Sequence, residues 1–249
     1  MTRPESEISV VWRLRLNIIG RGNVGIHLAK AFADVADVSV IDPHTLARLN
    51  PAADYTLICV SDNAVPEVAA KLAETSGIVA HTSGSVPLSA LPSSGCHANG
   101  VFYPLQTFSR DVVLDYSEIP VFIEGENEET AERLERLARL MSGNVRRARS
   151  DTRRRIHLAS VVACNFTNHL YALADDILKS DGIGFDALSP LIKETARKAA
   201  LGDPAANPTG PARRGDSSTI NRHLDMLAGN PRLREIYRLL SDSITDRYK

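Results

Sequence analysis

The chain has 249 residues, of which 43% are hydrophobic and 24% are charged, and its formal net charge at pH 7 is -1. This composition is typical of a globular protein and excludes a chain-wide basic field that would attract nucleic acid or an anionic membrane surface. The first residues lack the apolar core of a signal peptide, and no apolar run approaches the ~20 residues that cross a bilayer. The three cysteines have no metal-ligand spacing. We therefore expect a cytoplasmic protein with reduced cysteines, without a metal site and without a nucleic-acid or membrane partner.

Up to about residue 150, short β-rich runs alternate with helical patterns, which is typical of a parallel sheet covered by helices. Helices are predicted over residues 24–33 and 128–141, and a helix is also expected after each of the third and fourth strands. The predicted strands are residues 14–19, 38–41, 55–60, 78–81, 100–103 and 121–124.

Beyond residue 150 the pattern changes. Residues 156–178 form a long apolar-rich stretch without Gly or Pro, which predicts one continuous helix. Further helices are predicted over residues 188–200, over 219–227 and from residue 231. An arginine-rich run between residues 146 and 155 is interpreted as a solvated junction, with anion binding as the alternative. The predicted fold class is α/β: a Rossmann-type parallel-sheet domain at residues 12–150, followed by a smaller all-helical domain at residues 151–249.

A glycine-rich turn directly follows the first predicted strand and opens the first predicted helix. Gly20 would permit the tight turn, Gly22 would let backbone N–H groups approach a pyrophosphate, and Gly25 would allow close packing of helix and sheet. The helix N-terminus would offer unpaired donors to the phosphates. These features predict a dinucleotide site in this turn, which consists of Gly20, Arg21, Gly22, Asn23, Val24 and Gly25.

The end of the second strand bears on the identity of the cofactor. Asp42 lies where an acidic side chain would accept hydrogen bonds from ribose hydroxyls, which favours NAD. His44 and Arg48 follow closely, and either could meet the 2′-phosphate of NADP. Asp42 could instead stabilise the turn before Pro43. Both NAD and NADP therefore stay open.

Polar residues follow the third and fourth strands. Because ligands of open α/β sheets lie beyond the carboxyl ends of the strands, both ends should border the nicotinamide. We expect Val60, Ser61 and His81 to contact the cofactor. Ser83 is a candidate catalytic residue and Ser85 a candidate substrate-binding residue. Each serine could equally cap a helix, and His81 could be a structural histidine.

Together these motifs resemble a family of two-domain proteins with a Rossmann-like N-terminal domain and a C-terminal domain of unknown function, DUF2520. The resemblance covers nearly the whole chain and rests also on residues 60–62, 81–85, 103–108, 157–171 and 209–216. The family is described as NADP oxidoreductases and is similar to pyrroline-5-carboxylate reductases, ketopantoate reductases and β-hydroxyacid dehydrogenases. The resemblance implies reduction of a small carbonyl or imine compound, such as ketopantoate. An NADP enzyme is not expected to carry an acidic residue at the end of the second strand, so Asp42 departs from this pattern.

Polar residues on the long predicted helix are candidates for the chemistry. His157, Ser160, Cys164 and Asn168 are spaced by three or four and would share one face, with Asn165 beside it. Histidine is the commonest acid–base group near neutral pH, so His157 is the expected proton donor and Asn165 or Asn168 would orient the substrate. The similar dehydrogenases use a Lys and an Asn on the corresponding helix, but this stretch contains no lysine. A helix–helix hydrogen-bond network or a dimer seam is the alternative.

A loop rich in Gly and Pro carries Arg213 and Arg214, whose guanidinium groups could bind a substrate carboxylate. They could instead clamp two domains or subunits together. The leading prediction is NAD(P)H-dependent reduction of a small carboxylate-bearing ketone or imine, such as a 2-oxo acid or a cyclic imino acid. A catalytically inactive dinucleotide-binding regulatory protein is the alternative. The apolar helices of the second domain further predict a homodimer.

Overall fold

The computed structural model describes residues 13–206 and 209–248. The chain divides into two compact units, Met1–Cys164 and Asn165–Lys249. The boundary predicted at residue 150 marks the point where helix α4 (Ser150–Ser160) begins, whereas the compact units divide further along the same helical stretch. Residue 12, the predicted start of the first domain, lies outside the described residues.

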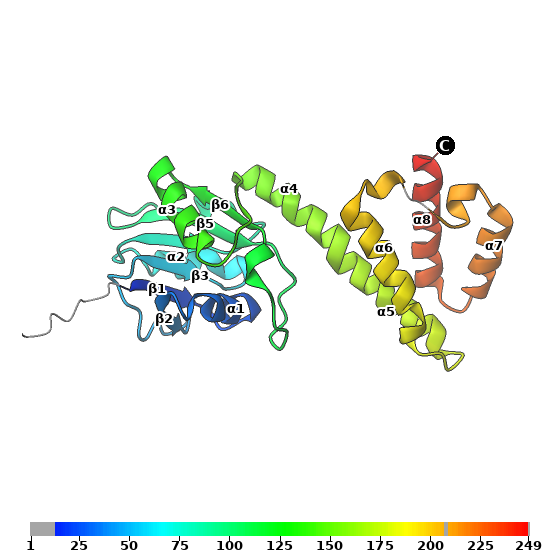
Figure 1. The fold of residues 1–249 in the computed structure, drawn as a ribbon, viewed down its shortest axis with the longest axis horizontal. Coiled ribbons are helices and arrows are strands. Elements are labelled where there is room, and N and C mark those ends of the chain that lie inside the picture. The colour runs from blue at the N-terminus through cyan, green and yellow to red at the C-terminus, as the bar shows by residue number, and fades with distance from the viewer. Residues whose placement is uncertain (1–12, 207–208, 249) are drawn as a thin grey trace, which may run out of the picture. The chain divides into compact units, whose positions relative to one another are not determined.

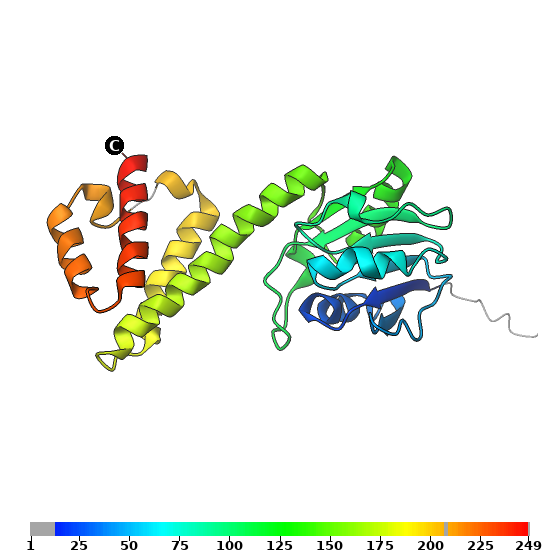
Figure 2. The same ribbon diagram turned by 180° about the vertical axis from the view of Figure 1, so that it is seen from behind.

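The first unit is built on a seven-stranded sheet with the order β2-β1-β3-β4-β5-β6-β7 (Figures 1 and 2). All neighbouring strands are parallel except β5 and β6, which are antiparallel. The predicted Rossmann-type fold is confirmed, but the sheet is not wholly parallel and β7 was not predicted. The strands are β1 (Leu14–Ile19), β2 (Ala36–Ile41), β3 (Tyr55–Ile58), β4 (Ile78–His81), β5 (Ala98–Pro104), β6 (Val121–Gly125) and β7 (Val145–Arg147).

Helices cover both faces of this sheet. Helices α1 (Asn23–Phe32) and α3 (Glu128–Arg139) contribute to one core cluster, and α2 (Val65–Ala70) contributes to another. Because successive residues of a strand point to opposite faces, Ile18 packs into the first cluster and Ile19 into the second. The central strands are therefore apolar on both sides, which is why they read as continuous hydrophobic runs.

Two connections differ from the prediction. The fourth strand is followed only by the short 3-10 helix η2 (Leu88–Ala90), because Gly84, Pro87 and Pro92 interrupt a regular helix there. Between β5 and β6 the chain forms only the 3-10 helix η3 (Tyr116–Glu118). Without a crossover helix in this connection, β6 returns antiparallel to β5.

The strand order creates a topological switch point in the first unit. Strand β1 pairs with β2 on one side and with β3 on the other, so the connections leave its carboxyl end in opposite directions. Ligands of open α/β sheets bind in the crevice at such a point. The glycine-rich turn lies directly after β1 and therefore at this crevice.

The second unit is helical, and the helical stretch that leads into it begins in the first unit. The stretch predicted as one helix over residues 156–178 consists of α4, a π-helical segment η4 (Val161–Phe166) and α5 (Thr167–Lys179). A π-helical turn needs more residues than an α-helical turn, so the spacing that placed His157 and Asn168 on one face does not hold across η4. The remaining elements are η5 (Phe185–Leu188), α6 (Ser189–Leu201), η6 (Pro204–Ala206), η7 (Ala212–Arg214), α7 (Ser217–Met226) and α8 (Pro231–Arg247).

Burial differs sharply between the units. Among the described residues of the second unit only Ala212 and Ser241 are buried, while Leu191 is 64% and Met226 79% exposed. The helices of this unit thus leave much of their apolar surface uncovered. No helix in the described ranges is long and apolar enough to cross a bilayer.

Candidate active site

Three glycines shape the turn after β1, each for a different reason. Gly20 has φ +121°, and a side chain there would collide with the Cys59 carbonyl. A side chain at Gly25 would collide with the Gly20 carbonyl, so this glycine allows α1 to lie close to the turn. Beside Gly22 there is open space, with nothing within 4 Å of an added Cβ. The turn therefore forms a cradle in which backbone donors can be approached closely.

A cavity of about 340 Å³ lies beside this cradle. The glycine turn with Arg21 forms one part of its lining, His44 from the end of β2 another, and Val60 and Ser61 from the end of β3 a third. This volume is within the range of small-ligand pockets. The open space beside Gly22, at the N-terminus of α1, fits a dinucleotide pyrophosphate.

Asp42 stabilises the turn after β2. Its Oδ1 accepts the His44 N–H at 2.9 Å. Backbone hydrogen bonds from His44 and Thr45, together with the nearby charges of His44 and Arg21, lower the pKa of the carboxyl group. Asp42 does not line the cavity, whereas His44 does. These contacts agree with the alternative in which Asp42 stabilises the turn before Pro43.

The connection between β5 and β6 is fastened to the glycine turn. Asn23 Nδ2 donates to the Phe108 carbonyl at 2.9 Å, and Arg110 Nη2 donates to the Arg21 carbonyl at 3.2 Å. The buried His27 of α1 holds the same segment through the Tyr116 hydroxyl. The side chain of Asn23, which was predicted to bind the cofactor, thus binds the β5–β6 connection. Val24, also predicted to bind the cofactor, packs against the core.

At the end of β4, His81 is fully buried and its Nδ1 accepts the Ser83 N–H at 3.2 Å. Burial, reinforced by the charge of Arg153, lowers the pKa of His81 to about 4. The ring is therefore neutral, with its proton on Nε2. Ser83 Oγ accepts the N–H groups of Ser85 and Val86, both at 3.1 Å. Ser83 thus stabilises a turn and does not cap a helix.

A tyrosine–histidine pair lies next to this turn. The hydroxyl of Tyr103, in β5, is 3.1 Å from His157 Nδ1, and the two rings pack edge to face. Burial raises the pKa of Tyr103, so the phenol keeps its proton. A Cβ added to Gly84 would lie 2.8 Å from both Tyr103 Oη and His157 Nδ1. The absence of a side chain at Gly84 is what allows the turn to pack on this pair.

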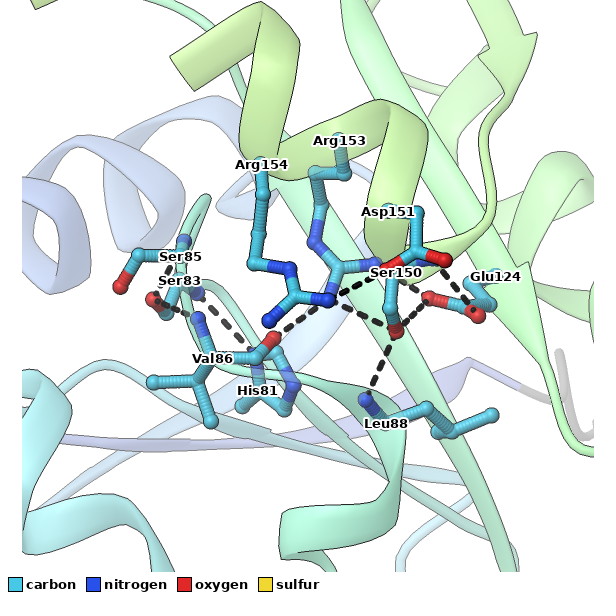
Figure 3. A network of polar contacts seen from close by, with 10 residues as sticks. All are labelled: His81, Ser83, Ser85, Val86, Leu88, Glu124, Ser150, Asp151, Arg153 and Arg154. Atoms are coloured by element: carbon cyan, nitrogen blue, oxygen red, sulfur yellow. Dashed lines mark hydrogen bonds and ion pairs between the residues drawn. The ribbon is translucent and has the colours of Figure 1, made fainter. Parts of the chain in front are cut away.

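Helix α4 is anchored by a buried polar network (Figure 3). Arg153 is fully buried, forms an ion pair with Glu124 of β6 and donates to the Val86 carbonyl. Ser150 Oγ donates to Glu124 at 2.8 Å and accepts the Leu88 N–H at 3.0 Å. This network fixes the start of α4 against the sheet and brings His157 to Tyr103. Arg153 is therefore not part of a solvated run, because its charge is needed beneath the helix.

The sequence comparisons define the family. The model of "Domain of unknown function (DUF2520)" matches residues 119–244. The chain belongs to the DUF2520 family. This finding confirms the resemblance drawn from the motifs. No curated protein sequence matches the chain.

Solved structures share the architecture of this DUF2520 chain. BF3122 from Bacteroides fragilis, whose name proposes NADP oxidoreductase activity, has 37% identity and a TM-score of 0.87, covering 94% of this chain and 98% of its own. An imine reductase from Streptomyces aurantiacus has 13% identity and a TM-score of 0.64, with 92% and 93% covered. Pyrroline carboxylate reductase from Plasmodium falciparum, solved with NADP bound, has 10% identity and a TM-score of 0.58, with 95% and 98% covered. The last two show likeness of fold alone.

Four predicted site residues of the DUF2520 chain belong to the second unit. Asn165, in η4, and Asn168, in α5, are exposed, although partners for buried polar groups were expected on this helix. Arg213 and Arg214 are also exposed, and the guanidinium of Arg213 lies over the Tyr248 ring at 5.1 Å from its centroid. The predicted residues that the structure brings together are those of the first unit.

Sequence reasoning gave no role to Tyr103, Gly84 or Asp62. Asp62 begins the 3-10 helix η1 (Asp62–Ala64) after β3 and accepts a hydrogen bond from the Ser85 hydroxyl. Each of the three lies at or just past the carboxyl end of a central strand. Their position at the strand ends is the sequence signal that could have identified them as site residues, because ligands bind at this edge of an open sheet.

Proposed function

We propose that this DUF2520 protein is an NADPH-dependent reductase of a small carboxylate-bearing ketone or imine. The observation that carries the proposal is the open cradle beside Gly22, at the switch point of a Rossmann-type sheet. Its relative BF3122, 37% identical over nearly the whole chain, is named for NADP oxidoreductase activity and supports the same cofactor.

Three features support NADP over NAD. Asp42 uses its carboxylate within the turn, and Arg21 and His44 line the cavity at that end. Glu67 also lines it, but Lys71 pairs with this carboxylate at 2.8 Å. Cationic and hydrogen-bonding groups there would favour the 2′-phosphate. When bound, the cofactor supplies a hydride.

The chain's own residues then take separate roles. The backbone of the glycine turn would hold the pyrophosphate, and Val60 and Ser61 would border the nicotinamide. We infer that His157, held by Tyr103, donates a hydrogen bond or proton to the atom that is reduced. The roles proposed for second-unit residues are unchanged: Asn165 and Asn168 would orient the substrate, and Arg213 and Arg214 would bind its carboxylate.

The decisive experiment compares calorimetric titrations of NADPH and NADH into the wild type and a Gly22→Val variant. An added Cβ at Gly22 has no protein atom within 4 Å, so folding should survive, but a branched side chain there fills the space that phosphate must enter. We expect tighter binding of NADPH than of NADH by the wild type, and a loss of about tenfold or more in NADPH affinity in the variant.

Gly95→Val is the matched control, because Gly95 also has nothing within 4 Å of an added Cβ. It should bind NADPH like the wild type. Unchanged NADPH affinity in a folded Gly22→Val protein would contradict the assignment of the turn.

We also propose that two copies of the chain assemble through the helices of the second unit. These helices bury only two described residues within their own unit and expose large apolar side chains, which supports a partner of the same kind. The three cysteines are free, which supports a reducing compartment such as the cytoplasm.

A further inference from the structure

The side chains at the carboxyl ends of β3, β4 and β5 carry an unbalanced negative charge. Asp62 accepts a hydrogen bond from Ser85, which holds the carboxylate beside the turn that contains Gly84. Within the described residues, no lysine, arginine or histidine forms an ion pair with Asp62. The carboxylate is exposed and can meet a ligand.

The neighbours of Asp62 do not cancel this charge. His81 is neutral because burial lowers its pKa to about 4, and Tyr103 stays protonated because burial raises its pKa. Ser85, which binds the Asp62 carboxylate, directly follows Gly84, and Gly84 packs on Tyr103 and His157. Arg153 carries a positive charge nearby, but Glu124 pairs with it.

We propose that Asp62 selects a substrate whose reacting group is a cation, namely the iminium form of an imine, over a neutral ketone. This inference rests on the proposed reductase function and narrows its substrate class. A carboxylate close to an imine nitrogen favours its protonated form, because opposite charges stabilise each other. Ser85 holds the carboxylate in place by donating its hydroxyl hydrogen.

The charge also decides how many protons the reaction needs at this site. An iminium already carries the proton that remains on the product nitrogen. Hydride addition would break a C–H bond of the reduced nicotinamide, which is oxidised, and form one C–H bond on the substrate. The π electrons of the C=N bond then become the nitrogen lone pair, and a neutral amine results. A ketone would instead need a proton at its oxygen, and a carboxylate beside that oxygen would oppose the developing negative charge.

The alternative for Asp62 is a structural one, in which its bond to Ser85 only ties two loops together. Asparagine would preserve such a bond, since its amide oxygen also accepts a hydroxyl hydrogen. Asp62→Asn therefore separates the two roles by removing the charge while keeping the acceptor. Glu129→Gln, on the exposed first turn of α3, removes the same charge elsewhere in the first unit and is the matched control.

The test is calorimetric binding of pyrrolidine and piperidine, cations at pH 7, to protein saturated with NADP⁺. Cyclopentanol and cyclohexanol serve as neutral probes of similar shape. We expect the wild type to bind each ammonium probe more tightly than its alcohol. Asp62→Asn should lose about tenfold in ammonium affinity and keep its alcohol affinity, whereas Glu129→Gln should change neither.

Either of two binding results would overturn the inference: no preference of the wild type for the ammonium probes, or equal ammonium affinity in Asp62→Asn and the wild type. The reductase proposal fails separately, if the wild type does not bind NADPH at all. A protein that binds NADPH and reduces neutral ketones as readily as imines would keep the reductase function and lose the role of Asp62.

Discussion

At the scale of single residues, the same side-chain pair occurs three times among the described residues. The Tyr103 hydroxyl lies 3.1 Å from His157 Nδ1, the Tyr237 hydroxyl lies 2.7 Å from His223 Nδ1, and the Tyr116 hydroxyl lies 2.9 Å from His27 Nδ1. All three pairs pack their rings edge to face. Only His157 lies beside the turn at the carboxyl end of β4, because Gly84 packs on it. Position relative to the sheet, and not the pair itself, singles out His157.

His157→Gln should therefore lower kcat by roughly 10²- to 10⁴-fold on a neutral ketone, because glutamine retains a hydrogen bond but cannot donate a proton as imidazole does. On an iminium, which already carries its proton, the loss of kcat should be smaller. NADPH affinity should change little. Tyr103→Phe should cause a smaller loss, since it removes the hydroxyl partner and leaves the ring. Steady-state kinetics on a panel of imines and 2-oxo acids, combined with calorimetry, measures both quantities.

His223→Gln is the matched control, and it should retain full turnover. Loss of kcat in His223→Gln together with full activity in His157→Gln would transfer the donor role to the second unit.

At the scale of elements, the start of α4 depends on a buried ion pair. Arg153 is fully buried and Glu124 nearly so, at 0% and 14% side-chain exposure. Glu124→Gln would leave a buried guanidinium charge without its counter-charge. The variant should lose about 3–5 kcal/mol of unfolding free energy, as measured by urea denaturation followed by circular dichroism.

The exposed pair between Arg147 and Glu128, at 2.5 Å, gives the contrast. Glu128→Gln should cost much less unfolding free energy than Glu124→Gln, because solvent screens the charges and Glu135 also pairs with Arg147. Equal losses in the two variants would mean that the buried pair does not anchor the helix.

The sequence predicted most elements because their signals are local. Residues 14–19 are mostly apolar and are followed by Gly20, so the first strand and its end were both visible. Strand β7 was missed because only Val145 of its three residues is apolar, as suits an edge strand. The π-helical segment η4 was missed because nothing in its residue pattern distinguishes a π-helical turn from an α-helical one.

The site was less predictable than the fold. The glycine turn was visible because the motif, the strand and the helix are adjacent in the sequence. The contact between Tyr103 and His157 joins residues 54 positions apart, and the burial of Arg153 depends on Glu124 in another element. The periodicity of a sequence does not reveal contacts between distant residues. The interpretation of the arginine-rich run as solvated was therefore wrong at Arg153.

At the scale of the whole molecule, the exposed apolar helices predict assembly. Leu191 of α6 is 64% exposed and Leu239 of α8 is 56% exposed. If two copies bury these side chains, the Leu191→Asp/Leu239→Asp variant should raise the dimer dissociation constant by at least about a hundredfold. Sedimentation at micromolar concentrations and near-neutral pH would then show a monomer in place of the wild-type dimer.

Val113→Asp provides the control, because Val113 is 97% exposed but belongs to the first unit. It should sediment like the wild type. A wild-type monomer under these conditions would remove the dimer proposal.

The unequal burial of the two units also bears on how the protein loses its structure. The first unit has apolar clusters on both faces of its sheet, so its cohesion does not depend on protein concentration. The helices of the second unit bury too little of their own surface to be stable alone. In the proposed dimer, the fraction of chains with ordered helices would therefore depend on protein concentration. Dilution would then loosen the helices while the sheet persists, and a single melting temperature would not describe the chain.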